Sequence, residues 1–305
     1  MKISTKLLFD RASNQMSLVQ NKLADSQAQL AQGKQILKPS DSPDQAAIVQ
    51  RLKSLLSKQD SFQNSLSTMR SRLELEDSTL RSATGLLVRA KEIAVQAAND
   101  TLSTVNRQAL GSELSAVRDQ LLSLANTTDT NGTFLFSGSR SKYPPFAPKN
   151  AGEPPTYRGD QTKMSVMVGE QRSIPINRTG TETFVSINRT GSNQAVGFFE
   201  VMDDLVNGIY SSDGAAMQQG IKEMTDLMNG LTLAHADIGT DMNVVDQQSS
   251  VVDDTILNLK TTVSSVEDLD YAAAITKMNQ QMLSLEAAQS SFSKMAQLTL
   301  FNYLK

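Results

Sequence analysis

The sequence predicts a mainly α-helical protein with a small β insert, built as an elongated antiparallel helical bundle or coiled coil. Apolar residues recur at alternating three- and four-residue steps in tracts at both ends of the chain and on both sides of its middle. That spacing is typical of a coiled-coil seam. The stretch 133–195 is instead rich in Pro, Gly, Thr and Asn. Because the helical tracts before and after it match in length, we expect the two halves to pair with the insert at the far end.

The first element is an N-terminal assembly helix within residues 1–41, with its helical pattern running to about Gln35. Pro39 disfavours helix at the residue before it, and Ser42 followed by Pro43 is a typical helix start. We expect the stripe on this helix to mediate assembly, through Phe9, Met16, Val19, Leu23 and Leu30.

Residues 42–132 form the first half of a predicted helical rod. A helix from Pro43 to Ala98 would be roughly 80 Å long at 1.5 Å per residue, which is too long for an ordinary globular domain. Its seam is interrupted by only two polar residues, Gln59 and Glu76. A further helix is predicted between Leu110 and Leu124, because its leucines and valine fall on one face.

Residues 133–195 are predicted to be a β-rich outer insert. Short strands are expected at 133–136, 164–168, 173–176 and 183–187, where β-branched and aromatic residues lie between turn residues. The segment Ile-Asn-Arg-Thr-Gly occurs twice, starting at Ile176 and at Ile187. We interpret each copy as the end of a strand followed by a polar turn.

Residues 196–266 form the second half of the predicted rod, and residues 267–305 a C-terminal assembly helix. A short amphipathic helix begins at Phe198, and a long seam then runs from Ile221 to Val266, interrupted by His235 and Ser249. We expect both end seams to lack partners in the free monomer and to be mobile there, as short unpaired helices are. The C-terminal stripe comprises Ile275, Met278, Met282, Leu285, Phe292, Leu300, Phe301 and Tyr303.

The composition argues against several classes of function. The formal net charge is -3 and the sequence pI is ≈ 5.4, so nothing directs the chain to nucleic acid or to anionic lipid. The chain has no Cys, which excludes disulfides and thiolate metal sites. No apolar run approaches the roughly 20 residues of a membrane span, and the start of the chain lacks the apolar core of a Sec signal peptide.

Residues that could support catalysis or metal binding have a structural interpretation here. His235 lies at a seam position, where a packed histidine is the more common case than a ligand or a base. Asp253 and Asp254, and the acidic residues from Glu267 to Asp270, fit solvated helix faces and caps. We therefore predict no enzyme activity, no metal and no cofactor. Asn-x-Thr sequons of no assigned role begin at Asn126, Asn131, Asn177 and Asn188.

Four segments resemble the flagellin superfamily of bacterial flagellar axial proteins. The first is Gln-Leu-Ala-Gln-Gly-Lys-Gln-Ile at 29–36, and the second is the Ser-x-Asp-x-x-x-Ala-like segment at 40–47. The third is the helical segment 88–99. The fourth, 266–272, is similar to the Ile-Glu-Asp-Ala-Asp-Tyr-Ala of that superfamily. The resemblance covers both terminal thirds of the chain.

Within this superfamily, the segments 133–139, 157–160 and 300–304 are similar to the subfamily at the junction of hook and filament. The resemblance implies a ring of copies of this chain, with hook-associated protein 1 and flagellin as neighbours. It also implies export through the flagellar type III apparatus, an extracellular location on the flagellum, and an export chaperone that binds the last helix. Candidate chaperone contacts are Phe292, Leu298, Leu300, Phe301 and Leu304.

Two alternatives to this interpretation stay open at the level of sequence. The chain could be a flagellin, which polymerises into the filament itself. It could also be an unrelated secreted coiled-coil protein. Filament formation by the purified chain distinguishes the first alternative, and retention of filaments by a deletion strain distinguishes the second.

Overall fold

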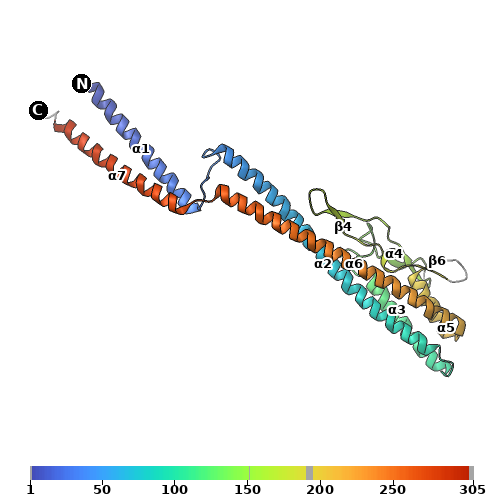
Figure 1. The fold of residues 1–305 in the computed structure, drawn as a ribbon. Coiled ribbons are helices and arrows are strands. Elements are labelled where there is room, and N and C mark those ends of the chain that lie inside the picture. Colours follow the sequence, from blue (N-terminus) through green and yellow to red (C-terminus); the bar gives the residue numbers. More distant parts are fainter. Residues whose placement is uncertain (1, 151, 190–194, 302–305) are drawn as a thin grey trace. The chain divides into compact units, whose positions relative to one another are not determined.

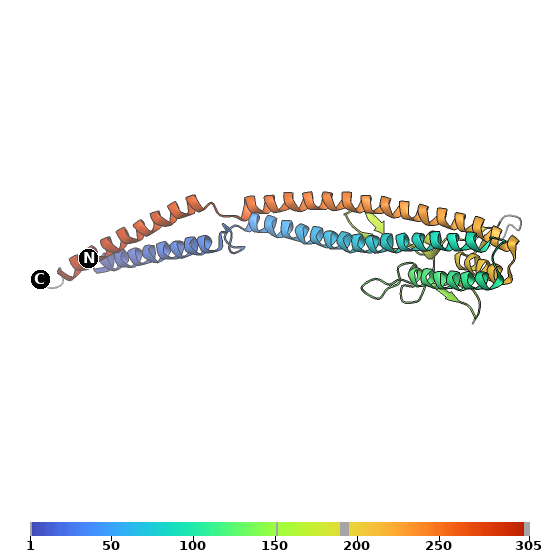
Figure 2. The same cartoon turned by 90° about the horizontal axis from the view of Figure 1, so that it is seen from below.

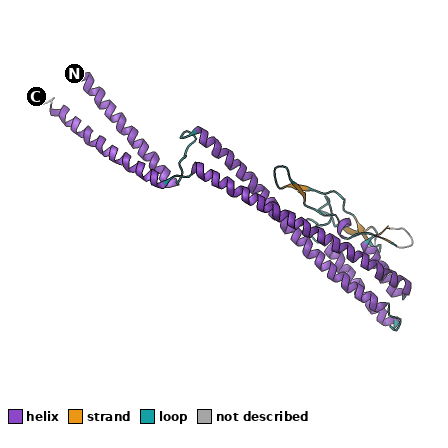
Figure 3. Cartoon of the chain, in the orientation of Figure 1, coloured by secondary structure: helices purple, strands orange, loops and turns teal. Residues whose placement is uncertain are grey.

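The computed structural model describes residues 2–150, 152–189 and 195–301, with the exception of the side chains of residues 2–6, 8 and 295–301. The chain forms two compact units. Unit 1 combines residues 1–58 with 254–305, and unit 2 comprises residues 59–253. The predicted fold class is confirmed, because long helices dominate and the short antiparallel strands are confined to the middle of the chain (Figures 1 and 3).

Unit 1 contains α1 (Lys2–Gln32), the start of α2 (Pro43–Ala97), the end of α6 (Gly214–Glu267) and α7 (Tyr271–Phe301). Helix α2 begins at Pro43, as predicted. Helix α1 ends three residues earlier than expected, because Gly33 adopts a left-handed φ of 67°. The backbone N–H of Lys34 then donates to the Gln29 carbonyl oxygen at 3.3 Å, a bond typical of glycine-terminated helices.

The two terminal helices pack against each other. Helices α1 and α7 lie side by side along their length (Figures 1 and 2). The ring centroids of Phe9 and Phe292 are 4.6 Å apart. Our expectation that the end seams lack a partner within the monomer is therefore wrong. Two seams of the same spacing, at the two ends of an antiparallel chain, can cover each other.

Unit 2 is built on the rest of α2 and the first part of α6, with α3 (Thr104–Ala125) and α5 (Phe198–Ser211) beside them. Polar contacts pair α2 with α6 in opposite directions. Arg70 lies 3.1 Å from Asp246, and Lys91 donates to Thr225 at 2.9 Å. The predicted antiparallel pairing is confirmed for these segments. Fully buried side chains fill the interface between the helices, among them Leu66, Leu80, Leu87, Ile93, Leu114, Leu121, Leu205 and Ile209.

The described insert contains three separate two-stranded antiparallel ladders. Strands β3 (Ser165–Met167) and β4 (Ser173–Pro175) confirm two of the predicted strands. Strands β1 (Phe146–Pro148) and β2 (Pro155–Tyr157) were not predicted, because prolines suggested loops at both places. Strand β5 (Ile187–Asn188) pairs with β6 (Ala195–Val196).

Two predicted strands are wrong. Residues 133–136 form turns, with only an isolated bridge from Phe134 to Thr128. The carboxylate of Asp129 accepts the backbone N–H groups of Asn131 and Thr133, at 2.8 and 3.0 Å, which favours a turn over a strand. The expected strand at 183–187 is instead the end of helix α4 (Gly180–Thr183) followed by a loop over 184–186, and only Ile187 lies in a strand, β5.

Candidate assembly surfaces

The covered stripe between α1 and α7 follows the predicted seam on α1. Met16, Val19, Leu23 and Leu30 are all partly covered, and Ser26 is buried, whereas Phe9 remains half exposed. On α7 the covered positions recur every three or four residues, as a helix packed along one side requires. They are Ala274, Met278, Gln281, Leu285, Ala288 and Phe292.

The stripe of α7 that packs on α1 differs from the predicted stripe at two positions, whose role in assembly stays a prediction. Ile275 and Met282 are 45% and 43% exposed, and the residues just before them, Ala274 and Gln281, take the covered places. Ala274 and Ser26 are both buried, so small side chains occupy this part of the covered stripe. Large apolar side chains remain exposed on the described part of these helices: Leu7, Phe9, Leu18, Tyr271, Ile275, Met282 and Leu283.

Part of the predicted C-terminal surface cannot be placed. The side chains of Leu298, Leu300 and Phe301 lie outside the described residues, as do Tyr303 and Leu304 entirely. The chaperone contacts and the last assembly residues therefore stay predictions. Of the chaperone candidates, only Phe292 is described, and its ring is partly covered by Phe9.

The two linkers of unit 1 are joined to each other next to the start of α7. Lys34 and Asp268 form an isolated antiparallel bridge. The N–H of Gln35 donates to the Glu267 carbonyl oxygen at 2.8 Å, and the N–H of Leu269 donates to the Gly33 carbonyl oxygen at 3.0 Å. We call this contact between residues 33–35 and 267–269 the linker joint. It holds the end of α1 against the end of α6.

A carboxylate shared by two lysines stabilises the linker joint. The ammonium groups of Lys34 and Lys53 each lie 2.8 Å from Oε1 of Glu267, whose side chain is largely buried. Burial alone would raise the pKa of Glu267, but the hydrogen bonds from Lys34 and Lys53 outweigh it and lower the pKa below 4.5. The same ion pair raises the pKa of Lys34.

We predict that the linker joint loosens at acidic pH. A carboxyl with a lowered pKa stabilises the folded state above its unfolded pKa, near 4.5, and loses that contribution as the pH falls through its folded pKa. Both lysines are partly exposed, so the expected loss is about 1 kcal/mol, or roughly fivefold in amide protection. Hydrogen exchange of Gln35 and Leu269, corrected for intrinsic rates, measures it.

Glu267→Gln should show the loosened joint throughout the range from pH 5 to 8. The matched control is Glu286→Gln, which removes an exposed carboxylate from α7. Equal protection in wild-type protein and Glu267→Gln at pH 7 would contradict the role of the shared carboxylate.

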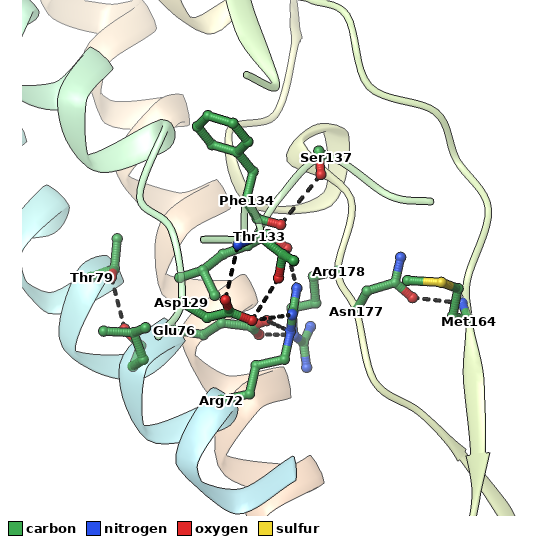
Figure 4. Close-up of polar contacts among 12 residues, drawn as sticks. Arg72, Glu76, Thr79, Asp129, Thr133, Phe134, Ser137, Met164, Asn177 and Arg178 are labelled. Atoms are coloured by element: carbon green, nitrogen blue, oxygen red, sulfur yellow. Dashed lines mark hydrogen bonds and ion pairs between the residues drawn. The ribbon is translucent and has the colours of Figure 1, made fainter. Parts of the chain in front are cut away.

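A buried polar cluster connects the insert of unit 2 to its long helices (Figure 4). Glu76 on α2 is 1% exposed and lies 3.3 Å from Nε of Arg72 and 3.6 Å from Nε of Arg178. Arg72 also donates to the carbonyl oxygen of Leu135 at 2.9 Å. Arg178, in the first Ile-Asn-Arg-Thr-Gly copy, pairs with Asp241 on α6. We call these residues the Glu76 cluster.

Sequence reasoning missed the Glu76 cluster, although one signal for it was present. Glu76 is one of only two polar residues on the long seam of α2. A carboxylate at a buried seam position requires a partner, because burying an unpaired charge is costly. Arg72, four residues earlier on the same helix, was an identifiable partner, but Arg178 was not, since it comes from the insert.

His235 lies opposite an acidic residue of α2. It lies on α6 with its Nε2 3.4 Å from Asp77 Oδ1 on α2, and its side chain is about one third exposed.

Within residues 2–150, 152–189 and 195–301, no helix combines the length and the apolar character that crossing a membrane requires.

The comparisons with known proteins agree with this architecture. Residues 3–141 match the bacterial flagellin N-terminal helical region, and residues 221–304 match the bacterial flagellin C-terminal helical region. These matches cover the terminal helices and most of the long helices α2 and α6. The chain therefore belongs to the flagellin superfamily of bacterial flagellar axial proteins.

Within this superfamily, the similarity extends over a full chain to flagellar hook-associated protein 3 of Escherichia coli. The two are 26% identical over 321 residues, covering 100% of each chain. A flagellin of Listeria monocytogenes is 23% identical over 97% of this chain and 95% of its own. A solved flagellar hook-associated protein from Vibrio parahaemolyticus superposes with a TM-score of 0.68 at 21% identity, covering 75% of this chain and 100% of its own. That structure supports the fold.

Proposed function

We propose that this chain is a structural subunit of the bacterial flagellum that joins the hook, through hook-associated protein 1, to the flagellin filament. The observation that carries the proposal is the similarity to hook-associated protein 3 of Escherichia coli over the whole of both chains. The paired terminal helices of unit 1 support it, because they provide an apolar surface beyond the one that they bury in each other. In this role the chain is a structural element and not an enzyme.

Deleting the gene tests the proposal. Cells without this chain should still build hooks but should release flagellin into the medium, because the filament then has no base on which to grow. Expressing the wild-type chain from a plasmid should restore filaments. A deletion strain with filaments of normal length and no excess secreted flagellin would show that the proposed role is wrong.

The proposed role assigns a task to each segment of the chain. Residues 1–41 and 267–305 are the assembly helices, 42–132 and 196–266 form the rod, and 133–195 is the outer insert. We expect the exposed apolar side chains of α1 and α7 to contact copies of this chain and the adjoining axial proteins, since water otherwise surrounds them.

A filament subunit is the second candidate, because the Listeria monocytogenes flagellin matches nearly the whole chain. The two candidates differ in self-assembly. A junction subunit must bind different neighbours on its two faces, so it should not extend indefinitely on itself. Electron microscopy of the purified chain, with a flagellin under the same conditions as control, should show no filaments of this chain alone.

We predict that a chaperone for export binds the last helix. The proposal places this chain outside the cell, and the apolar residues near its C-terminus then need cover in the cytoplasm before export. Removing residues 270–305 should abolish chaperone capture in a pull-down and leave unit 2 folded by circular dichroism. Removing residues 2–32 instead is the matched control and should leave capture intact. Undiminished capture by the chain without residues 270–305 would contradict the prediction.

A further inference from the structure

Both arginines of the repeated Ile-Asn-Arg-Thr-Gly segment form ion pairs with acidic residues of α6. Arg178, in the first copy, pairs with Asp241 and lies 3.9 Å from Asp237. Arg189, in the second copy, donates to Glu223 at 2.8 Å through Nε and at 3.1 Å through Nη2. Equivalent residues of an internal repeat therefore make equivalent contacts.

The two acidic partners lie on the same side of α6. Glu223 and Asp241 are 18 residues apart, which is about five full turns at 3.6 residues per turn. Gln248 follows about two turns later, donates to the Val168 carbonyl oxygen at 3.1 Å, and accepts from Arg172 at 3.1 Å. These three residues form what we call the docking stripe of α6.

Between the contacts of the two arginines, a glycine of α6 lets the insert lie close to the helix. Gly230 follows Glu223 by seven residues, so it lies on the same side of the helix. A Cβ atom at Gly230 would lie 2.3 Å from Cγ2 of Val185, which is in the segment between the two repeats. A larger residue at 230 would therefore require Val185 or the adjoining backbone to shift.

The strands of the insert are too short to hold it in place. Each described ladder joins two strands of two or three residues. Isolated two-stranded ladders are marginal in water even when they are longer. The arginine contacts are stronger candidates, because they are charge-assisted and, at Glu223, bidentate.

The contact at Arg178 is the more deeply buried of the two. It includes Glu76, which is 1% exposed and which also pairs with Arg72 of α2. Removing Arg178 takes away one of the two guanidinium groups beside Glu76 and the partner of Asp241. Nη2 of Arg189 also lies 2.7 Å from Oδ2 of Asp204, on α5. The two contacts in this way fasten the insert to different neighbouring helices, while both use α6.

We propose that the repeated segment is a two-point clamp, in which Arg178 and Arg189 independently fix two stretches of the insert to the docking stripe of α6. The Arg178 anchor fixes the β3–β4 ladder, which directly precedes it in the chain. The Arg189 anchor fixes the β5–β6 ladder, of which β5 ends one residue before it. This clamp keeps the insert in one position on the helices whatever the role of the assembled protein.

Hydrogen exchange on the full chain tests the clamp through Arg178→Gln and Arg189→Gln. Arg178→Gln should speed exchange about tenfold at Ile176 and Val168, whose amides close the β3–β4 ladder, and leave Ile187 and Val196 unchanged. Arg189→Gln should do the reverse. The matched control is Arg89→Gln, which breaks an exposed pair with Glu113 far from the insert in sequence and should change neither ladder.

Two further variants separate the clamp from general unfolding. Arg178→Gln combined with Glu76→Gln leaves no unpaired buried carboxylate and should loosen the β3–β4 ladder while the amides of α2 stay protected. The charge swap Arg189→Glu with Glu223→Arg should restore at least part of the protection that Arg189→Glu alone removes. Two results of the single Gln variants would contradict the clamp: amide exchange equal to that of the wild type in both, or equal loosening of both ladders in each. It would also be contradicted if the double variant lost amide protection in α2, or if the charge swap restored none of the protection of the β5–β6 ladder.

Discussion

Replacing both Leu285 and Phe292 by Asp is expected to abolish filament attachment. The two residues are seven apart on the covered side of α7, and the ring of Phe292 lies 4.6 Å from that of Phe9. An unpaired carboxylate in this seam costs several kcal/mol, so the charged helix should leave α1. Under the proposed function, cells with this variant should secrete flagellin and lack filaments, as measured by immunoblots of the medium and electron microscopy.

A matched control adds the same charges to the opposite side of α7. Leu283 and Ser290 are also seven residues apart, and both are exposed, Leu283 at 69%. Asp at these two positions should leave the pairing of α1 and α7 intact in the purified chain, by helix content in circular dichroism. Normal filaments in cells with the Leu285 and Phe292 variant would contradict the prediction. So would an unchanged helix content of that variant.

The long helices were predictable because their signals are local. The start of α2 at Pro43 follows from Ser42 and Pro43 alone, and the apolar spacing defines the helix that follows. The shift of the seam on α7 was not predictable, since Ile275 and Ala274 are both apolar.

The candidate sites were harder to predict, because their residues come from distant parts of the chain. Glu267 was interpreted as a helix cap, yet its side chain joins Lys34 and Lys53 across more than 200 residues of sequence. The repeat was recognised, but each copy was interpreted only as the end of a strand followed by a polar turn. Its arginines pair with acidic residues of α6. These pairs could not be predicted, because only the fold places α6 beside the insert. The heptad spacing of Glu223, Gly230 and Asp237 was the one local sign of a second face on α6.

Glu76 should make the stability of unit 2 rise as the pH falls from 8 to 5. Burial raises its pKa from 4.5 to about 7, against the opposing effect of Arg72 and Arg178. Charge balance favours the same direction. With Glu76 neutral, the carboxylates of Asp129 and Asp241 balance the two guanidinium groups, and a third carboxylate leaves an excess negative charge.

The sign and size of the effect follow from proton linkage. Well above pH 7, Glu76 is ionised in both the folded and the unfolded chain, so it adds no pH dependence to the free energy of unfolding there. Between pH 7 and 4.5, the folded chain binds a proton that the unfolded chain does not, so the free energy of unfolding increases. The expected gain between pH 8 and pH 5 is about 2–3 kcal/mol, at roughly 1.4 kcal/mol per pKa unit.

Comparison of wild-type protein with Glu76→Gln isolates this contribution. Other titrating groups, including Asp203, whose pKa burial also raises, act equally in both proteins and cancel in the difference. Urea unfolding at pH 8, 7, 6 and 5, followed by circular dichroism and tyrosine fluorescence, should show the wild type gaining about 2–3 kcal/mol relative to Glu76→Gln on acidification. Glu74→Gln, which removes an exposed carboxylate two residues earlier, should track the wild type. The opposite result would be parallel profiles of unfolding free energy against pH for wild type and Glu76→Gln, or a wild type that loses stability relative to that variant on acidification. Either result would mean that the two arginines keep Glu76 ionised and that burial is the weaker effect.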